Sequence, residues 1–275
     1  MPKNSDKKVI NDFGEEWNVY KQDGQYIDLK KNFLDYFSVL PEKFLNKNAV
    51  GFDAGCGSGR WAKFVAPKVK KLHCIDPSEK ALLVAKKNLK IFDNCEFHSS
   101  SINSVKIREE SMDFGYCLGV LHHIPNTISA LKYCVSMLKK EAPMLIYIYY
   151  SFDNKPYWFK LIWKMTDILR KLISRLPFPL KLIISRVIAL LIYFPLARIS
   201  LLIEKIGFDV SNLPLSSYRS KSFYTMLTDS LDRFGTKLEK RFSKKQIHEM
   251  MTKCGLKSIK FSDTDPYWVC VGYKK

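Results

Sequence analysis

Residues 50–61 read VGFDAGCGSGRW, and this stretch decides the fold. A short β-rich run ends at Asp53, and Gly55, Gly57 and Gly59 follow in the spacing GxGxG before a helical segment. Glycines permit a tight turn and let the backbone approach a ligand where a Cβ would prevent it. The dinucleotide fingerprint is GxGxxG instead. A carboxylate beside the loop repels pyrophosphate, but it suits a ligand that carries cationic ammonium and sulfonium groups.

A second acidic residue marks the next strand. The run KLHCID, residues 71–76, ends at Asp76, which lies 21 residues beyond Gly55. A carboxylate at the end of a strand can accept hydrogen bonds from both hydroxyls of a ribose. The glycine loop and Asp76 fall in register on consecutive strands, so together they predict a site for a ligand that contains a ribose.

The rest of the chain sets these two strands in a parallel sheet. Short β-rich runs alternate with helical segments from about residue 49 to residue 150. This pattern predicts a Rossmann-like α/β fold, with ligands bound at the carboxyl ends of its strands. The alternation stops at residue 151 and resumes near residue 241 with a helix and two last strands. Ser243 and Gln246 have the spacing of a capping box at the start of that helix, and Gly255 stands where a C′ glycine is expected at its end. We therefore expect an N-terminal helical cap (1–48), a core (49–150), a helical insert (151–240) and a completing segment (241–275).

Three motifs resemble those of the class I S-adenosylmethionine-dependent methyltransferases, of the type 11 and type 12 kind. DAGCGSGRW is similar to the first motif of that family, IDPSEKALLVAKKNL to the second and SMDFGYCLGVLHHIP to the fourth. The resemblance covers residues 49–150 and the final helix and strand pair, and it implies a mostly parallel sheet of seven strands whose last strand is antiparallel. MLIYIYYSFDNKPYWF and DRFGTKLEKRFSKKQI also resemble uncharacterised bacterial members with a helical insert after the fifth strand.

The resemblance implies a cofactor, S-adenosylmethionine, and the residues around it. In that family the glycine loop wraps the amino acid part, the acidic residue binds ribose and the next residue lies against adenine. The implied cofactor contacts are Trp17, Asp53, Ala54, Gly55, Cys56, Gly57, Asp76, Pro77, Ser101, Ile102 and Gly119. The family usually has an acidic residue after the third strand. This chain has SSSIN (99–103) there, so Ser101 or Asn103 is the expected replacement.

Two further segments bear on the reaction. FGEEW (13–17) resembles the FGxEW segment of some of these enzymes, in which an aromatic helix can close over the cofactor, and it makes Phe13, Trp17 and Tyr20 candidates for a lid. CLGVLHHIPN (117–126) lacks the Asn/Asp-Pro-Pro-Tyr type of sequence of enzymes that methylate exocyclic amines in nucleic acids. This departure weakens the case for such a substrate.

Candidate catalytic side chains follow the fourth and fifth strands. Methyl transfer from a sulfonium is an in-line displacement, and a hydroxyl acceptor usually needs a base. His122 or His123 can take that proton near neutral pH, although an HHIP turn can also pack one histidine and expose the other. The other candidates are Tyr150 and Asp153 for catalysis, and Tyr149, Tyr224, Asp229 and Arg233 for substrate binding. Core packing, a turn or a solvated linker would explain these residues equally well.

Composition limits the class of protein and its expected cellular location. The 275 residues carry a net charge of +18 and are 47% hydrophobic, which excludes a disordered or fibrous chain. Residues 151–275 hold 23 basic and 10 acidic residues, so most of the excess lies there. Seven widely spaced cysteines without a CxxC pair argue against disulfides and against a metal site. Since the N-terminus also lacks the apolar core of a signal peptide, we expect a cytoplasmic protein that can reach the inner face of the membrane.

The predicted insert is basic and amphipathic. Residues 155–205 hold 10 basic and 2 acidic residues. Basic and apolar residues fall on opposite sides of its first helix: Lys160, Lys164, Lys171 and Arg175 against Phe159, Ile162, Met165, Leu169, Leu172 and Leu176. Such a helix can cap a substrate pocket, pair with a second subunit or lie in a lipid headgroup layer. Pro177, Pro179 and Pro195 should end or kink successive helices, and the longest uncharged run, 187–197, is too short to cross a bilayer.

These features favour one function over two others. The preferred hypothesis is a methyltransferase for a small-molecule or lipid-like acceptor, with O-methylation favoured because histidines and tyrosines ring the expected site. The first alternative is an RNA methyltransferase that uses the basic C-terminal part, although aliphatic runs interrupt the charge and no RNA-binding module is recognisable. The second is a non-catalytic protein that binds S-adenosylmethionine. The expected partners are the acceptor, an anionic membrane surface and a second copy through the insert, while nucleic acid is disfavoured.

Overall fold

The computed structural model describes residues 4–22 and 26–275 and separates two compact units. One unit, the core, consists of Met1–Ser151 and Leu238–Lys275. The other, the helical unit, is Phe152–Lys237. The predicted insert began one residue earlier and ended three residues later than the helical unit does.

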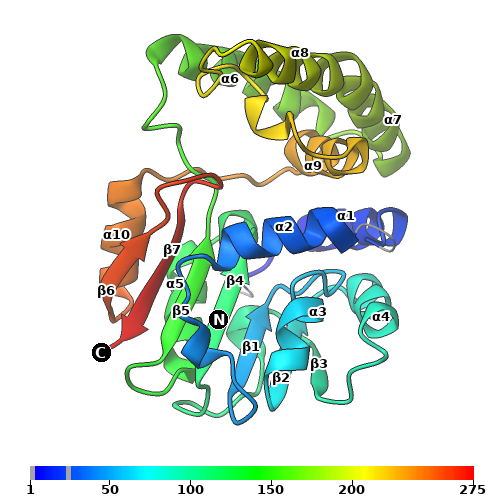
Figure 1. Ribbon diagram of the computed structural model, residues 1–275. Coiled ribbons are helices and arrows are strands. Elements are labelled where there is room, and N and C mark those ends of the chain that lie inside the picture. The colour runs from blue at the N-terminus through cyan, green and yellow to red at the C-terminus, as the bar shows by residue number, and fades with distance from the viewer. Residues whose placement is uncertain (1–3, 23–25) are drawn as a thin grey trace. The chain divides into compact units, whose positions relative to one another are not determined.

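A seven-stranded sheet forms the centre of the core (Figure 1). Its strands are β1 (Val50–Ala54), β2 (Lys71–Asp76), β3 (Cys95–Ser99), β4 (Phe114–Leu118), β5 (Pro143–Tyr147), β6 (Leu256–Phe261) and β7 (Val269–Lys274). They lie in the order β3-β2-β1-β4-β5-β7-β6, and only β7 runs antiparallel to its neighbours. The predicted fold class is confirmed. The direction of the winding reverses between β1 and β4, which is where open α/β sheets bind ligands.

Helices cover both faces of this sheet. They are α1 (Lys7–Val19), α2 (Tyr26–Phe37), α3 (Ala62–Val65), α4 (Glu79–Asn88), α5 (Thr127–Met137) and α10 (Lys244–Lys253), with the short 3₁₀ helices η1 (Glu42–Phe44), η2 (Ala66–Lys68), η3 (Ile102–Ser104) and η4 (Leu121–His123). Buried side chains of α2, α3 and α4 join one apolar cluster with strand residues such as Tyr116. Those of α5 and α10 join a second cluster with Phe52 and Met144. The sheet is therefore buried on both sides.

Local sequence fixes the ends of the helices that flank the site. Ser78 accepts a hydrogen bond from the Ala81 N–H at the start of α4, directly after Asp76. Ser243 and Gln246 form the capping box at the start of α10 that their spacing predicts. Each cap satisfies backbone donors that a helix leaves free in its first turn.

The helical unit contains α6 (Tyr157–Ile173), α7 (Phe178–Ile188), the π-helix η5 (Ala189–Tyr193), α8 (Phe194–Lys205), η6 (Ser216–Tyr218) and α9 (Phe223–Gly235). Pro177 and Pro179 stand at the start of α7, as expected. Pro195 was expected to end or kink a helix, and it does not end one, because α7, η5 and α8 run on as one helix from Phe178 to Lys205. A proline lacks the N–H of a regular turn and crowds the carbonyl four residues earlier, and the π turn directly before Pro195 relieves both.

This helix, Phe178–Lys205, is long and apolar enough to cross a membrane by length and composition. The sequence predicted no membrane-spanning helix here, because Arg186 and Arg198 limit the longest uncharged run to residues 187–197. Only 22% of its most apolar stretch is buried, so it is not the shielded central helix of a soluble fold.

Candidate functional site

The loop after β1 requires glycine at three of its positions. Gly55, Gly57 and Gly59 have φ angles of +84°, +54° and +77°, which disfavour residues with a side chain. A Cβ on Gly55 would lie 2.4 Å from Cγ2 of Val120, and one on Gly57 would lie 2.9 Å from Nε1 of Trp17. The backbone N–H groups of Gly55 and Cys56 donate to the Ile75 carbonyl, which ties the loop to β2.

Asp53 is a buried acid at the mouth of this loop. It is 1% exposed, and its Oδ2 has no hydrogen-bond partner within the described part of the chain. Burial raises the pKa of the Asp53 carboxyl to about 8, and the charge of Asp76 adds to the shift. The neighbouring Tyr116 hydroxyl and Arg60 guanidinium lower it only in part. An unsatisfied buried carboxyl fits a cationic ligand, which would stabilise its ionised form.

Asp76 connects the glycine loop to the start of α4. Its two carboxylate oxygens accept hydrogen bonds from the backbone N–H groups of Gly57 and Ser78, at 3.0 and 2.8 Å. Burial raises the pKa of Asp76 to about 6, although these two hydrogen bonds favour the ionised form. Pro77 follows and is partly exposed, whereas Ala54 and Cys56 are buried. The loop and the acidic residue predicted from the sequence therefore lie together at the ends of β1 and β2.

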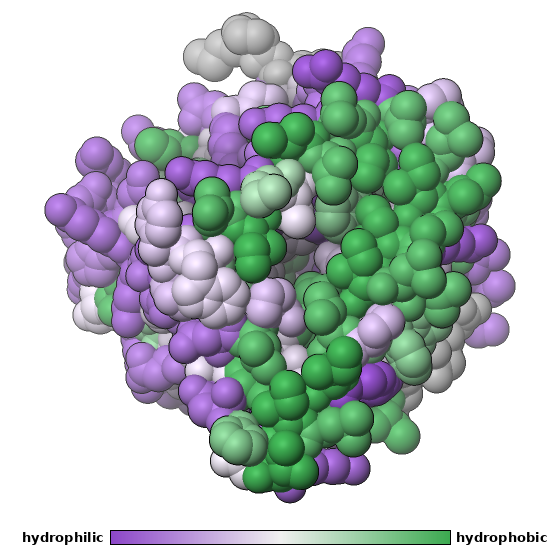
Figure 2. Space-filling model, turned by 90° about the horizontal axis from the view of Figure 1, so that it is seen from above, coloured by the Kyte–Doolittle hydropathy of each residue, from purple (hydrophilic) through white to green (hydrophobic). Residues whose placement is uncertain are grey.

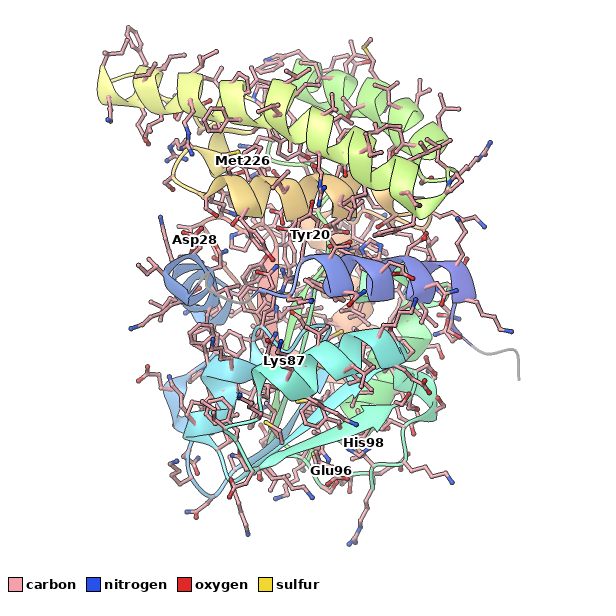
Figure 3. All side chains as sticks on the ribbon, turned by 90° about the vertical axis from the view of Figure 1, so that its right-hand side faces the viewer. Tyr20, Asp28, Lys87, Glu96, His98 and Met226 are labelled. Carbon is pink, nitrogen blue, oxygen red and sulfur yellow. The ribbon has the colours of Figure 1, made fainter. Side chains whose placement is uncertain are left out.

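Helix α1 covers the loop. The Trp17 indole lies over Gly57, and the Arg60 guanidinium lies 5.0 Å from the Trp17 ring. The Phe13 ring lies 4.9 Å from the His123 ring. Tyr20, at the end of α1, is buried (Figure 3). Of the three aromatic residues expected in a lid, Phe13 and Trp17 thus lie on the helix that closes this edge of the sheet, and Tyr20 is its C-cap.

The segment after β3 has polar side chains that are already engaged. The Asn103 amide donates to the Ser129 carbonyl at 3.1 Å and accepts a hydrogen bond from the Asn4 side chain. The Ser101 hydroxyl pairs with that of Ser104 at 2.7 Å, and Ile102 is buried. Of the two replacements expected for the usual acidic residue, Asn103 is tied into the packing of α5, and Ser101 is the better candidate.

The two histidines of η4 have opposite tautomers. The Tyr149 N–H donates to His122 Nδ1 at 3.4 Å, so neutral His122 carries its proton on Nε2. His123 Nδ1 lies 2.6 Å from the Leu238 carbonyl oxygen. Because a carbonyl only accepts, Nδ1 of His123 carries the proton and its basic lone pair is on Nε2.

His122 is also the more shielded of the pair. Its side chain is fully buried, and the Tyr149 ring stacks on it at 3.8 Å. Burial, together with the charges of His123 and Arg241, holds the pKa of His122 well below its ordinary value. His122 is therefore a weak base and mainly supports the turn.

Sequence and structure comparisons agree with this geometry. A family model described as a methyltransferase domain matches residues 52–146, which span β1 to β5. Residues 52–146 therefore belong to this family of methyltransferase domains. The chain is 25% identical, over 146 residues, to the ubiquinone biosynthesis O-methyltransferase of Hahella chejuensis. The matched part is 51% of this chain and 59% of that relative.

Solved structures support the fold over a longer span. An S-adenosylmethionine-dependent methyltransferase from Thermotoga maritima aligns over 96% of this chain and 99% of its own chain, with a TM-score of 0.51 and 16% identity. A candidate O-methyltransferase from Nostoc punctiforme aligns over 94% of this chain and 60% of its own, with a TM-score of 0.54 and 13% identity. At these identities the likeness concerns the fold alone.

The remaining site residues predicted from the sequence fall in two groups. Tyr149 and Tyr150 belong to the core, where the Tyr150 ring packs on Tyr267 and burial raises its pKa. Asp153, Tyr224, Asp229 and Arg233 belong to the helical unit. Within that unit Asp153 is exposed in a turn, and Arg233 lies 3.6 Å from the carboxylate of Asp167.

Four residues of the site were not singled out from the sequence. Arg60 lies over Trp17, and the nearest atom to a Cβ built on Gly119 is Nη2 of Arg60, at 4.0 Å. Tyr116 faces Asp53, Leu238 orients His123 and Arg241 covers the Tyr149 ring at 5.0 Å. Arg60 belongs to the quoted glycine motif and could have been found there. The roles of Leu238 and Arg241 depend on the chain's return to the core, which no local pattern shows.

One group of potential metal ligands occurs in the described part of the chain. His73, on β2, lies beside Glu96 and His98, on β3 (Figure 3). His73 Nδ1 and His98 Nε2 are 2.9 Å apart, and the Glu96 carboxylate pairs with the Lys71 ammonium. Burial lowers the pKa of His73 to about 4, so a hydrogen bond between two neutral imidazoles accounts for the pair.

Proposed function

We propose that this methyltransferase transfers the methyl group to a hydroxyl of a small-molecule or lipid-like acceptor. When bound, S-adenosylmethionine supplies an electrophilic methyl group on a sulfonium. The residues that would hold it are those assembled at the ends of β1 and β2. Asp53 would face the cationic part, Gly55 and Gly57 would allow the backbone to approach, and Asp76 would accept from ribose hydroxyls. Trp17 would exclude water from above the loop.

The orientation of His123 is the observation that carries the proposal. A hydroxyl becomes a good nucleophile when a base removes its proton during the transfer. The hydrogen bond from Nδ1 to the Leu238 carbonyl fixes the ring and places the basic lone pair on Nε2. A carbonyl partner of this kind holds the tautomer without adding a negative charge. His123 is therefore the residue that we assign as the base.

His122 cannot take this role equally well. Its Nδ1 already accepts the Tyr149 N–H, and burial lowers its pKa. The sequence left the choice between the two histidines open, and the hydrogen bonds favour His123. The curated relative carries the name of an O-methyltransferase, which supports the same reaction type.

A matched pair of substitutions tests the proposal. Full-length protein is incubated with methyl-labelled S-adenosylmethionine and a panel of phenols, catechols and hydroxylated lipids, and products are identified by mass spectrometry. His123→Ala should slow methylation by about 10²- to 10⁴-fold, and added imidazole should restore part of the rate. His122→Asn, which keeps an acceptor for the Tyr149 N–H, should reduce the rate of methylation much less. Equal losses in both variants, or a labelled amine as the product, would overturn the proposal.

A further inference from the structure

The helical unit exposes an unusually large apolar surface. Among the described residues 26 large hydrophobic side chains are exposed, and 20 of them lie between Tyr157 and Phe208. Their exposed fractions are equivalent to about eleven fully exposed side chains, or on the order of 1,000 Å² at about 100 Å² each. The largest apolar patch on a typical soluble monomer is about 300–600 Å². Figure 2 shows apolar side chains gathered in a broad band on the face that it views.

The exposed residues form stripes along α6 and along the helix made of α7, η5 and α8. On α6 they include Leu161, Ile162, Met165, Ile168, Leu169 and Leu172, at spacings of one, three and four residues. On α7 and η5 they include Leu180, Ile183, Val187, Leu190 and Leu191, and on α8 they include Leu196, Ile199 and Leu202. This spacing places each set on a single helix face. The exposure is therefore a property of whole helix faces rather than of scattered residues.

The inner side of the helical unit is polar by contrast. Between residues 152 and 237 nine polar or charged side chains are buried and only seven hydrophobic ones. Among the described residues of the core, 11 polar or charged side chains and 53 hydrophobic side chains are buried. The Ser230 hydroxyl donates to the Ser185 carbonyl at 2.7 Å, between α9 and α7. Arg170 pairs with Asp167 and donates to the Thr236 carbonyl. Small hydroxyl residues and satisfied polar groups between helices, with aliphatic groups outside, are typical of helices surrounded by lipid.

Basic residues border the apolar stripes. On α6, Lys164 and Lys171 follow one edge of the stripe, about 100–120° from its centre at 100° per residue, and Arg175 follows just beyond the end of the helix. Lys171 is well exposed, although one of its contacts is with Asp167. Arg186 on α7 stands at the corresponding edge of its own stripe and is also exposed. Such residues can keep their charged ends at the lipid headgroups while their stems cover apolar surface.

The positive charge of the helical unit favours an anionic bilayer over a second copy of the chain as the partner that covers this apolar surface. A two-fold dimer through this face would bring two units of the same sign together, since residues 155–205 hold 10 basic and only 2 acidic residues. An anionic bilayer complements the basic edge and also covers aliphatic side chains without requiring a matching shape. One side of each helix packs within the unit, so the helices would lie in the plane of the interface rather than cross it.

We propose that the exposed apolar face of α6, α7, η5 and α8 inserts into the headgroup and upper acyl region of an anionic membrane. The membrane then holds the methyltransferase where lipid-like acceptors are concentrated. This attachment is independent of the methyl transfer itself, although it agrees with a lipid-like acceptor.

Vesicle flotation tests the proposal with the full-length protein. The vesicles contain phosphatidylcholine alone or with phosphatidylglycerol. The protein should float with the anionic vesicles, and Leu169→Glu with Leu191→Glu should weaken binding by about tenfold or more for each substitution. The control, Leu83→Glu with Ile91→Glu, changes two exposed hydrophobic residues of the core and should bind as the wild type does. Helix content from circular dichroism should be the same in all variants, since every changed residue is exposed.

A second pair of variants tests the basic edge. Lys164→Gln, Lys171→Gln and Arg175→Gln together should weaken binding to the anionic vesicles by about fivefold for each charge and reduce its dependence on salt. The same change at exposed lysines of the core, such as Lys90 and Lys253, should have little effect.

Two outcomes would overturn the membrane proposal. One is that the wild-type protein does not float with the anionic vesicles. The other is a detergent-free dimer in analytical ultracentrifugation that Leu169→Glu with Leu191→Glu dissociates, with no vesicle binding. Calorimetry with S-adenosylhomocysteine on the same variants keeps this test separate from the proposed reaction. A variant that no longer binds vesicles but still binds S-adenosylhomocysteine affects membrane attachment alone. A wild-type protein that does not bind S-adenosylhomocysteine would contradict the proposed reaction, and it would leave the membrane proposal untouched.

Discussion

Binding of the cofactor should release a proton from Asp53. In the ligand-free protein burial raises the pKa of this carboxyl to about 8, so about 0.9 of the population is protonated at pH 7. A cationic ammonium or sulfonium beside it favours the ionised form. S-adenosylhomocysteine, whose own amino group is already mostly protonated at pH 7, should therefore displace close to one proton. Asp76, with a pKa of about 6, would release only about 0.1 proton more.

Calorimetry in buffers of different ionisation enthalpy measures this proton directly. At pH 7 the observed enthalpy should vary with the buffer with a slope that corresponds to about 0.9 proton released. Affinity should rise about tenfold between pH 6 and pH 7, because fewer molecules then need to lose the proton before binding. Asp53→Asn should bind more weakly and lose the buffer dependence. A wild-type slope of zero, or an equal slope in the variant, would refute the assignment of Asp53 as the partner of the cationic group.

Three further predictions follow from the same contacts. Folding raises the pKa of Asp53 from 3.8 to about 8, so the ligand-free protein loses stability as pH rises through this window, and Asp53→Asn should raise the melting temperature at pH 8 but not at pH 4. Gly57→Ala should abolish tight binding of S-adenosylhomocysteine, because its Cβ would meet Trp17, whereas Gly207→Ala, also at positive φ but with nothing within 4 Å, should leave the affinity unchanged. Ser243→Ala should cost about 1 kcal/mol in urea unfolding without altering cofactor affinity; a loss of affinity there would contradict the assignment of the cap to stability alone.

The sequence predicted the parts of the fold that depend on local chemistry. The positive φ angles of the glycine loop, the position of Asp76 at the end of β2 and the capping box at Ser243 are each determined by residues within a short segment. Gly255, with a φ of +91°, ends α10 where a C′ glycine was expected. Such features can be predicted because backbone sterics and capping act over a few residues.

Other features required the folded chain. Leu238 lies 115 residues from His123, so the hydrogen bond that distinguishes the two histidines has no local pattern. The apolar stripe that includes Leu169 has the same spacing whether it packs inside the protein or faces a lipid surface. Only its exposure in the structure shows that the apolar side faces outward and the polar side inward. Pro195 was expected to end or kink a helix, and only the structure shows the π turn that precedes it and lets the helix continue.

The identity of the methylated product tests the central claim most directly. Full-length protein, methyl-labelled S-adenosylmethionine and the panel of hydroxylated small molecules and lipids should yield a methyl ether, detected by mass spectrometry. The product should be absent with Asp53→Ala and strongly reduced with His123→Ala. A labelled amine or labelled RNA, or no transfer to any acceptor by protein that binds the cofactor, would contradict the account.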